Sequence, residues 1–149
     1  MNLNHNASHH RGRRIDCLTA ALILAAITGC GNDLGRVSGL VTLDGQPLRG
    51  GNGVTATVMF QPTGGGPPGV GTVDGRGRYE IASGSQSGLK PGDYAVTCAA
   101  TQLIPGKDGG AASGKGLTDP KYASAGASGL QSTVQPGANE FNIELTSVK

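Results

Sequence analysis

Turn-forming residue pairs divide the chain into short segments, and this spacing limits its fold more than any other feature. The turn-forming pairs are Asp44-Gly45, Asp74-Gly75, Pro91-Gly92 and Pro136-Gly137. The chain contains 27 glycines. A glycine inside a helix costs about 1 kcal/mol relative to alanine, whereas a turn uses its conformational freedom at no steric cost. We therefore predict an all-β fold of short strands joined by turns.

Seven segments between these turns alternate apolar and polar residues, which is typical of half-buried strands. They cover residues 37–43, 54–61, 69–73, 78–82, 94–100, 130–134 and 139–146. The residues expected to face inward are Val37, Gly39, Val41, Leu43, Val54, Ala56, Val58, Phe60, Tyr79, Ile81, Tyr94, Val96, Cys98, Ala100, Phe141, Ile143 and Leu145. Seven strands at this spacing predict a β-sandwich over residues 36–146, followed by a short tail at 147–149.

One long stretch lacks any hydrophobic period. Residues 105–127 are rich in Gly, Ala, Ser and Lys. We interpret this stretch as a long, exposed, flexible loop, and whether it becomes ordered on binding is left open.

The first 29 residues have the features of a bacterial signal peptide. Arg11, Arg13 and Arg14 precede an apolar run from Leu18 to Ile27. A bilayer span takes about 20 apolar residues, so this run is too short to cross. It instead suits the hydrophobic region of a secretory signal.

The end of that run resembles the lipobox of bacterial lipoproteins. Ile27-Thr28-Gly29-Cys30 combines an aliphatic residue, a small residue, Gly and then Cys. The resemblance implies diacylglycerol attachment to Cys30, cleavage after Gly29 and acylation of the new amino terminus. Residues 1–29 would then be removed, and residues 30–35 would form a lipidated tether. Cys98 would be the remaining free thiol, which excludes an intrachain disulfide in the mature domain and suggests a small buried hydrophobe.

Several motifs of the remaining chain resemble the carboxypeptidase regulatory-like domain, a transthyretin-like (prealbumin-like) seven-stranded sandwich. The matching segments are residues 37–48, 58–62, 71–79, 89–96, 120–122 and 139–145. Residues 71–79 are similar to the family's T-D-x-x-G-x-Y hairpin, and residues 89–96 to its L-x-P-G-x-Y-x-V turn and strand. The resemblance implies an accessory module, and its motifs concern structure rather than activity.

The sequence after residue 30 lacks the usual catalytic and metal-binding groups. All three histidines, His5, His9 and His10, precede it, which excludes Ser-His-Asp and Cys-His catalysis and histidine-based zinc sites in their usual forms. The C-terminal residues 145–149 also lack the Tyr-Arg-Gly-Ser motif of transthyretin-like hydrolases. We therefore expect no catalytic residue, metal or cofactor.

Weaker motifs leave a few alternatives. Gly64-Gly65-Gly66 and Gly110–Lys115 approach a phosphate-binding loop but lack its pattern and its strand-to-helix context. Calcium binding would need two loops to bring together some of the turn aspartates, which are Asp44, Asp74, Asp93, Asp108 and Asp119. Tyr122 is either a ligand contact or an anchor that holds a loop on the sandwich edge. Arg76, Arg78 and Glu80 suggest a solvated face.

The charge balance excludes a nucleic-acid surface. After residue 30 the chain carries nine basic and nine acidic residues, which are dispersed along it. A segment with no net charge and no basic cluster is not typical of phosphate binding. We therefore expect a non-catalytic lipoprotein of the cell envelope, anchored to a membrane through Cys30 and facing the periplasm or the exterior. Its partner would be an unidentified envelope protein. The alternatives are a carbohydrate or cell-wall binding module, disfavoured by the lack of spare aromatic residues, and the regulatory part of an envelope enzyme.

Overall fold

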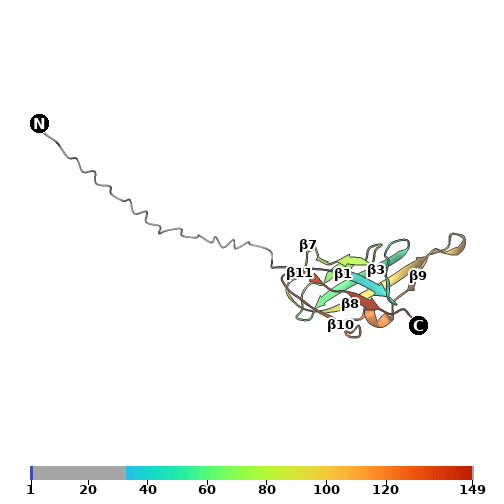
Figure 1. The fold of residues 1–149 in the computed structure, drawn as a ribbon. Helices are drawn as coiled ribbons and strands as arrows, with labels where there is room; N and C mark the ends of the chain where they lie inside the picture. The colour runs from blue at the N-terminus through green and yellow to red at the C-terminus, as the bar shows by residue number, and fades with distance from the viewer. Residues whose placement is uncertain (2–32, 149) are drawn as a thin grey trace. The chain divides into compact units, whose positions relative to one another are not determined.

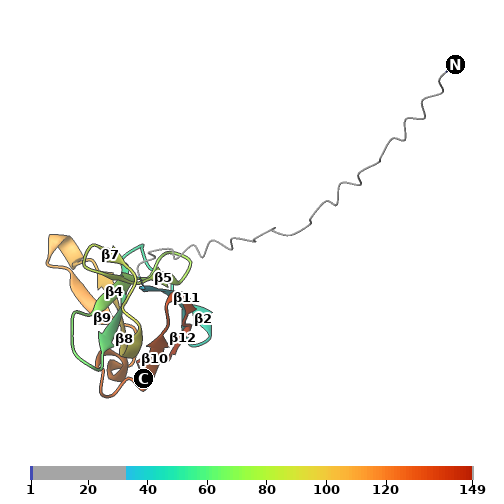
Figure 2. The same ribbon diagram turned by 90° about the vertical axis from the view of Figure 1, so that its left-hand side faces the viewer.

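Two β-sheets packed face to face make up the folded domain (Figures 1 and 2). The computed structural model describes Met1 and residues 33–148, and within the latter range the chain forms one compact unit. Its helical segments are two 3-10 turns, η1 (Lys107–Gly109) and η2 (Pro120–Ala123). The prediction of an all-β sandwich is therefore confirmed. Gly29, Cys30 and the predicted signal peptide beyond Met1 lie outside the described residues.

The smaller sheet is organised around the first strand of the domain. Its members are β1 (Gly35–Leu43), β2 (Gln46–Pro47), β5 (Arg78–Glu80), β11 (Gly137–Glu140) and β12 (Ile143–Leu145). β1 pairs antiparallel with β2 and β5 on one side and parallel with β11 and β12 on the other. Asp44 and Gly45 join β1 to β2 with positive φ angles of 50° and 79°, as the hairpin signal in the sequence predicts.

The larger sheet contains the longest strands. Its members are β3 (Val54–Pro62), β4 (Gly69–Thr72), β6 (Ala82–Ser83), β7 (Gln86–Ser87), β8 (Gly92–Ile104), β9 (Ser113–Gly116) and β10 (Leu130–Val134). The order is β10-β8-β3-β4-β6-β7, and β9 pairs with the last four residues of β8. Residues 101–116 project from the sandwich as a two-stranded hairpin, here called the β8–β9 arm (Figures 1 and 2).

The structure divides the seven predicted strands into more elements than expected. Glu80 belongs to the smaller sheet through its pair with Ser38, whereas Ala82 pairs with Val70 in the larger one. The chain thus changes sheet at Ile81. The last predicted strand is also interrupted, between β11 and β12, where Asn142 accepts a hydrogen bond from the backbone N–H of Leu40 at 2.8 Å.

The stretch of residues 105–127, predicted as one long, exposed, flexible loop, contains the strand β9 and the turn η2. Residues 113–116 form β9, because backbone hydrogen bonding to β8 needs no hydrophobic period in the side chains. Further on, η2 buries Tyr122, which is only 7% exposed. Asp119 caps this turn by accepting a hydrogen bond from the N–H of Lys121 at 3.0 Å.

An aromatic cluster joins the two sheets in the core. Phe60 of β3 is fully buried, and its ring centroid lies 6.1 Å from that of Tyr94 in β8. From the smaller sheet, the rings of Tyr79 and Phe141 lie 6.4 and 5.9 Å from Phe60. Such ring pairs add about 0.5–1.5 kcal/mol each beyond the burial of their surface. Four of the five aromatic residues therefore form one central cluster.

A glycine makes room for this cluster. Gly39 lies in β1, where an added Cβ would overlap the carbonyl group of Phe141 and lie 3.1 Å from Cε1 of Tyr79. The hydroxyl of Tyr79 donates a hydrogen bond to the same Phe141 carbonyl. A side chain at position 39 would therefore push apart the strands that hold the aromatic rings in place.

We expect Gly39→Ala to destabilise the domain by about 1–3 kcal/mol, the usual cost of overpacking a core. Gly64→Ala is the matched control, since a Cβ there meets nothing within 4 Å, and a surface change of this kind stays within about 0.5 kcal/mol. Urea unfolding of both variants and the parent measures the difference. Equal midpoints for the two variants would show that the close approach at Gly39 is unimportant.

Burial also lowers the reactivity of the one cysteine in the described domain. Cys98 is fully buried in β8, and desolvation raises the pKa of its thiol to about 12. In a Cys17→Ser, Cys30→Ser variant, we expect this thiol to resist a maleimide at pH 8 until denaturant is added. Because the folded pKa lies above the unfolded value, its contribution to stability is complete below about pH 9 and is lost as the pH rises toward 12. Rapid maleimide labelling of Cys98 in the native protein at pH 8 would contradict the expected protection of the thiol.

Candidate functional site

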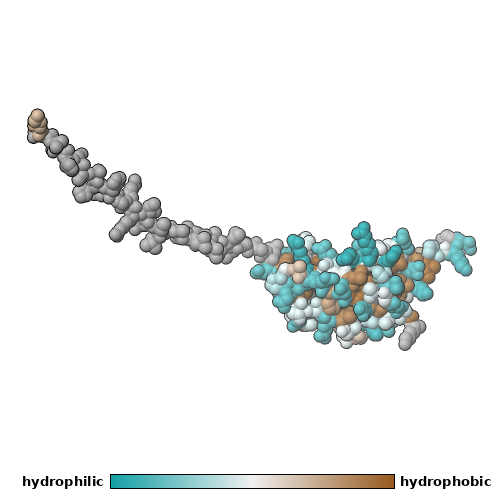
Figure 3. Space-filling model, viewed as in Figure 1, coloured by the Kyte–Doolittle hydropathy of each residue, from teal (hydrophilic) through white to brown (hydrophobic). Residues whose placement is uncertain are grey.

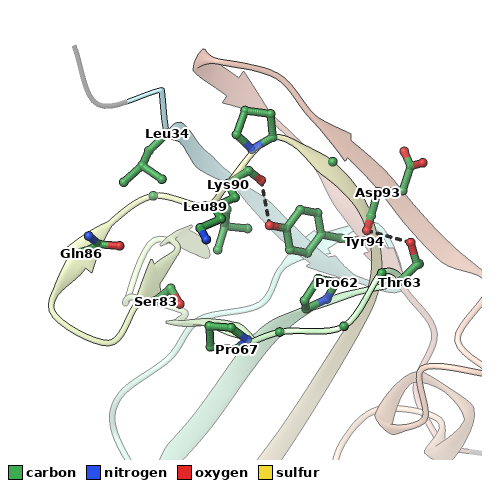
Figure 4. Close-up of a pocket in the computed structure, with 16 residues that line it drawn as sticks. Leu34, Pro62, Thr63, Pro67, Ser83, Gln86, Leu89, Lys90, Asp93 and Tyr94 are labelled. Atoms are coloured by element: carbon green, nitrogen blue, oxygen red, sulfur yellow. Dashed lines mark hydrogen bonds between the residues drawn. The ribbon is translucent and has the colours of Figure 1, made fainter. Parts of the chain in front are cut away.

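A hollow lies between three loops at one end of the sandwich (Figure 4). Its volume is about 450 Å³, within the range of small-molecule sites. The loops are residues 62–67 after β3, the β6–β7 hairpin, and residues 88–94 leading into β8. Apolar groups make up much of the wall: Leu34, Pro62, Pro67, Leu89, Pro91 and the ring of Tyr94.

Hydrogen bonds hold two of these loops in place. The N–H and hydroxyl of Thr63 both donate to the carbonyl of Asp93, at 2.9 and 3.1 Å. The hydroxyl of Tyr94 donates to the carbonyl of Lys90 at 2.8 Å, and burial raises the pKa of Tyr94, which favours this protonated donor. The loop after β3 and the loop before β8 are therefore joined to each other around the hollow.

The chain enters the domain beside the same hollow. Leu34 lies in its wall, directly before β1. Gly35 and Leu89 exchange two backbone hydrogen bonds of 2.7 and 2.8 Å, which fix the start of β1 against the loop before β8. The tether predicted from the sequence therefore ends at this hollow.

The polar groups around the hollow do not form a nucleophile and base pair. The hydroxyl of Ser83 donates to the carbonyl of Pro68 at 3.3 Å, and the remaining polar side chains in the lining are Thr63, Gln86, Lys90 and Asp93. Triad chemistry needs a base within hydrogen-bond reach of the nucleophile. The hollow is instead suited to binding an apolar group of a ligand, with a few polar side chains around its rim.

Three of the aspartates singled out in the sequence, Asp44, Asp74 and Asp119, accept hydrogen bonds from backbone N–H groups in different parts of the domain. Asp74 accepts hydrogen bonds of 2.8 Å from the N–H groups of Arg78 and Arg76, and these lower the pKa of its carboxyl group. Asp44 accepts from the N–H of Ser147 at 3.1 Å. Within residues 33–148, no three His, Cys, Asp or Glu side chains come together as a metal site would require. The Asp93 carboxylate instead accepts from the hydroxyl of Thr133, and no calcium site forms from the aspartates within this range.

The other sequence candidates are also dispersed. The Gly64–Gly66 loop lines the hollow, whereas Lys115 lies on the arm. The ring of Tyr122 is buried and its hydroxyl lies 3.4 Å from Oγ1 of Thr146, so it anchors η2 to the sandwich. Arg76, Arg78 and Glu80 are exposed, as the solvated-face interpretation predicts.

Sequence reasoning did not identify the hollow. Its lining comes from segments that are separated by turns and meet only when both sheets are formed. The proline and glycine content of residues 62–68 is the available signal, and it is typical of a loop without indicating that this loop lines a cavity.

Comparisons with known proteins give little further information. Among the described residues, no helix has the length and apolar character needed to span a membrane. The chain matches no protein-family model and none of the curated proteins. Among solved structures, it is similar to a 9R-lipoxygenase from Cyanothece PCC8801, with 16% identity and a TM-score of 0.35 over 76% of this chain. The matched region covers only 16% of the lipoxygenase, and at this TM-score the likeness supports no conclusion about fold or activity.

Proposed function

We propose that the protein is a lipoprotein of the bacterial cell envelope, in which a non-catalytic β-sandwich is held at a membrane through Cys30. The observation that carries this proposal is the order of elements along the chain. Arginines, a short apolar run and the lipobox-like Ile27–Cys30 precede β1, which begins at Gly35. A signal of this kind is useful only if a folded module follows it, and the sandwich starts within five residues of Cys30.

Acylation of Cys30 would account for stable membrane attachment. Each buried CH₂ of an acyl chain contributes about 0.8 kcal/mol, and one chain alone binds only reversibly. Diacylglycerol together with an amino-terminal acyl group supplies enough apolar surface to hold the protein. The anchor therefore needs no apolar surface from the sandwich itself.

A short tether would keep the hollow near the anchor. The five residue steps from Cys30 to Gly35 span at most about 18 Å when fully extended. Leu34 and Leu89 line the hollow beside the start of β1. The loops around the hollow would therefore work close to the membrane surface, where an apolar segment of an envelope protein could reach them.

The resemblance to carboxypeptidase regulatory-like domains supports an accessory role. The quoted motifs have structural uses in this domain. Asp44 and Gly45 form the first hairpin, Asp74 organises the turn before β5, and Tyr79 and Tyr94 join the core. We accordingly propose that the module binds an envelope protein or supports envelope structure, rather than catalysing a reaction.

A carbohydrate-binding role gains no support from the domain. Sugar-binding surfaces commonly present aromatic rings to solvent. All five aromatic residues of this chain are buried or half-buried, with four of them in the core cluster around Phe60.

The lipid anchor is tested by metabolic labelling with a palmitate analogue in a bacterial host. We expect the parent and Cys17→Ala to incorporate label and Cys30→Ala to lose it, because the thioether forms only on the residue-30 thiol. Intact mass of the labelled parent should show loss of residues 1–29 and a gain of acyl groups. Retained label in Cys30→Ala, or a mature form that still carries residues 1–29 without acyl groups, would refute the proposal.

A further inference from the structure

The outer face of the larger sheet has a single charged side chain. Residues directly opposite each other on paired strands share a face, and the register of the sheet therefore defines which side chains point outward. On β3, β4 and β6 these are Thr55, Thr57, Met59, Gln61, Val70, Thr72 and Ala82. On β8 and β10 they are Asp93, Ala95, Thr97, Ala99, Thr101, Leu103, Gln131 and Thr133. The one charge, Asp93, lies at the start of β8, away from the arm.

The outer face of the smaller sheet is different. The same analysis of its register places charged residues over β1 and the strands on both sides of it: Arg36, Arg78, Glu80, Glu140 and Glu144. Both faces belong to one domain and are open to solvent, so solvent exposure alone does not explain why one face carries five charged residues and the other carries one. The difference points to a distinct role for the larger sheet.

Large apolar side chains are also exposed on the uncharged face. Met59 and Val70 are neighbours across β3 and β4, with 36% and 40% of their surfaces exposed. Leu103 is 56% exposed where β8 enters the arm. Figure 3 views the domain from the opposite side, that of the smaller sheet, where hydrophilic and hydrophobic residues are intermixed. Depletion of charge together with exposed apolar groups is typical of the centre of a protein interface.

The strand β9 of the arm extends this face with glycines, which add neither bulk nor charge to it. Gly114 and Gly116 of β9 pair with Leu103 and Thr101 and therefore lie on the same face. Lys115 pairs with Gln102 and points to the opposite side. The carboxylate of Asp93 accepts a hydrogen bond from the hydroxyl of Thr133 at 2.6 Å, so the single charge at the edge already has a partner within the sheet.

We propose that this face docks against the same face of a second copy of the chain, as two β-sheets stacked about a two-fold axis. Charge is the argument for this occupant. A charged partner would lose the solvation of its ions and find no counter-charge on the face, whereas a second copy brings an equally neutral surface. Thr hydroxyls and Gln amides both donate and accept hydrogen bonds, so the face also complements itself in hydrogen bonding. Stacked sheets pack about 10 Å apart with their side chains interdigitated.

The size of the face indicates a weak contact. Four adjacent strands at about 4.8 Å spacing, with nine residues in β3, outline a flat area on the order of 500 Å². A stable interface buries about 800 Å² on each partner. The association therefore benefits from holding both copies on one membrane, and this part of the inference rests on the proposed lipid anchor. Its test belongs in membranes that contain the full chain.

The test is cysteine crosslinking in membranes of cells that express the full chain. Thr57→Cys introduces a thiol near the centre of the face, and Ser38→Cys places one on the smaller sheet. The parent chain reports any background from its own cysteines. With a short bifunctional maleimide, we expect Thr57→Cys to give a covalent product of twice the chain mass, and Ser38→Cys to give little above background.

A charge variant tests the same contact without depending on the position of the crosslinker. Adding Met59→Glu to Thr57→Cys places like charges close to each other across the two-fold axis, and we expect about tenfold less crosslinked dimer. The matched control Ala138→Glu adds the same charge to the outer face of the smaller sheet and should leave the yield unchanged. Both positions are exposed, so neither change disturbs the core.

Three results would overturn the proposal: equal yields from Thr57→Cys and Ser38→Cys, no dimer from Thr57→Cys, or a product whose mass shows a different protein. Palmitate labelling of the same samples separates this outcome from the anchor. A labelled chain that does not crosslink would refute the sheet contact alone, whereas a crosslinked chain without label would refute the lipoprotein proposal and retain the contact.

Discussion

The contact of Phe60 with rings from both sheets is the interaction on which the rest of the domain depends. Tyr94 lies beside Phe60 within the larger sheet, while Tyr79 and Phe141 reach it from the smaller one. With so few aromatic side chains available, the aromatic contacts between the two sheets gather around one ring, and smaller apolar side chains fill the rest of the core. Gly39 allows this close approach because it leaves space beside the Phe141 carbonyl.

Much of the fold could be predicted because strand alternation and turn chemistry are local properties. The inward positions from Val37 to Val41 and from Tyr94 to Ala100 are buried, as their period of two indicates. The alternation of apolar and polar residues does not reveal the change of sheet at Ile81, because a strand that crosses from one sheet to the other keeps the same pattern of burial. β9 escaped prediction for a related reason. Its Ser-Gly-Lys-Gly sequence has no apolar side, and pairing with β8 rests on the backbone.

Less of the candidate site could be predicted, because it depends on distant segments. The hollow needs Leu34, the loop after β3 and the loop before β8 to meet at one end of the sandwich. The uncharged face likewise exists only in the register that aligns β3 with β8 and β4. The turn aspartates illustrate the opposite case. The turn at Asp74 can be predicted from neighbouring residues alone, and the carboxylate accepts hydrogen bonds from backbone N–H groups two and four residues further on.

The position of β1 has a mechanical consequence. The strand nearest the amino terminus lies in the middle of its sheet, hydrogen-bonded to β2 and β5 on one side and to β11 and β12 on the other. Tension applied through Leu34 would act along this strand and load both rows of hydrogen bonds together in shear, instead of peeling them apart one by one. A domain that is pulled through its first strand in this way resists being opened by that pull.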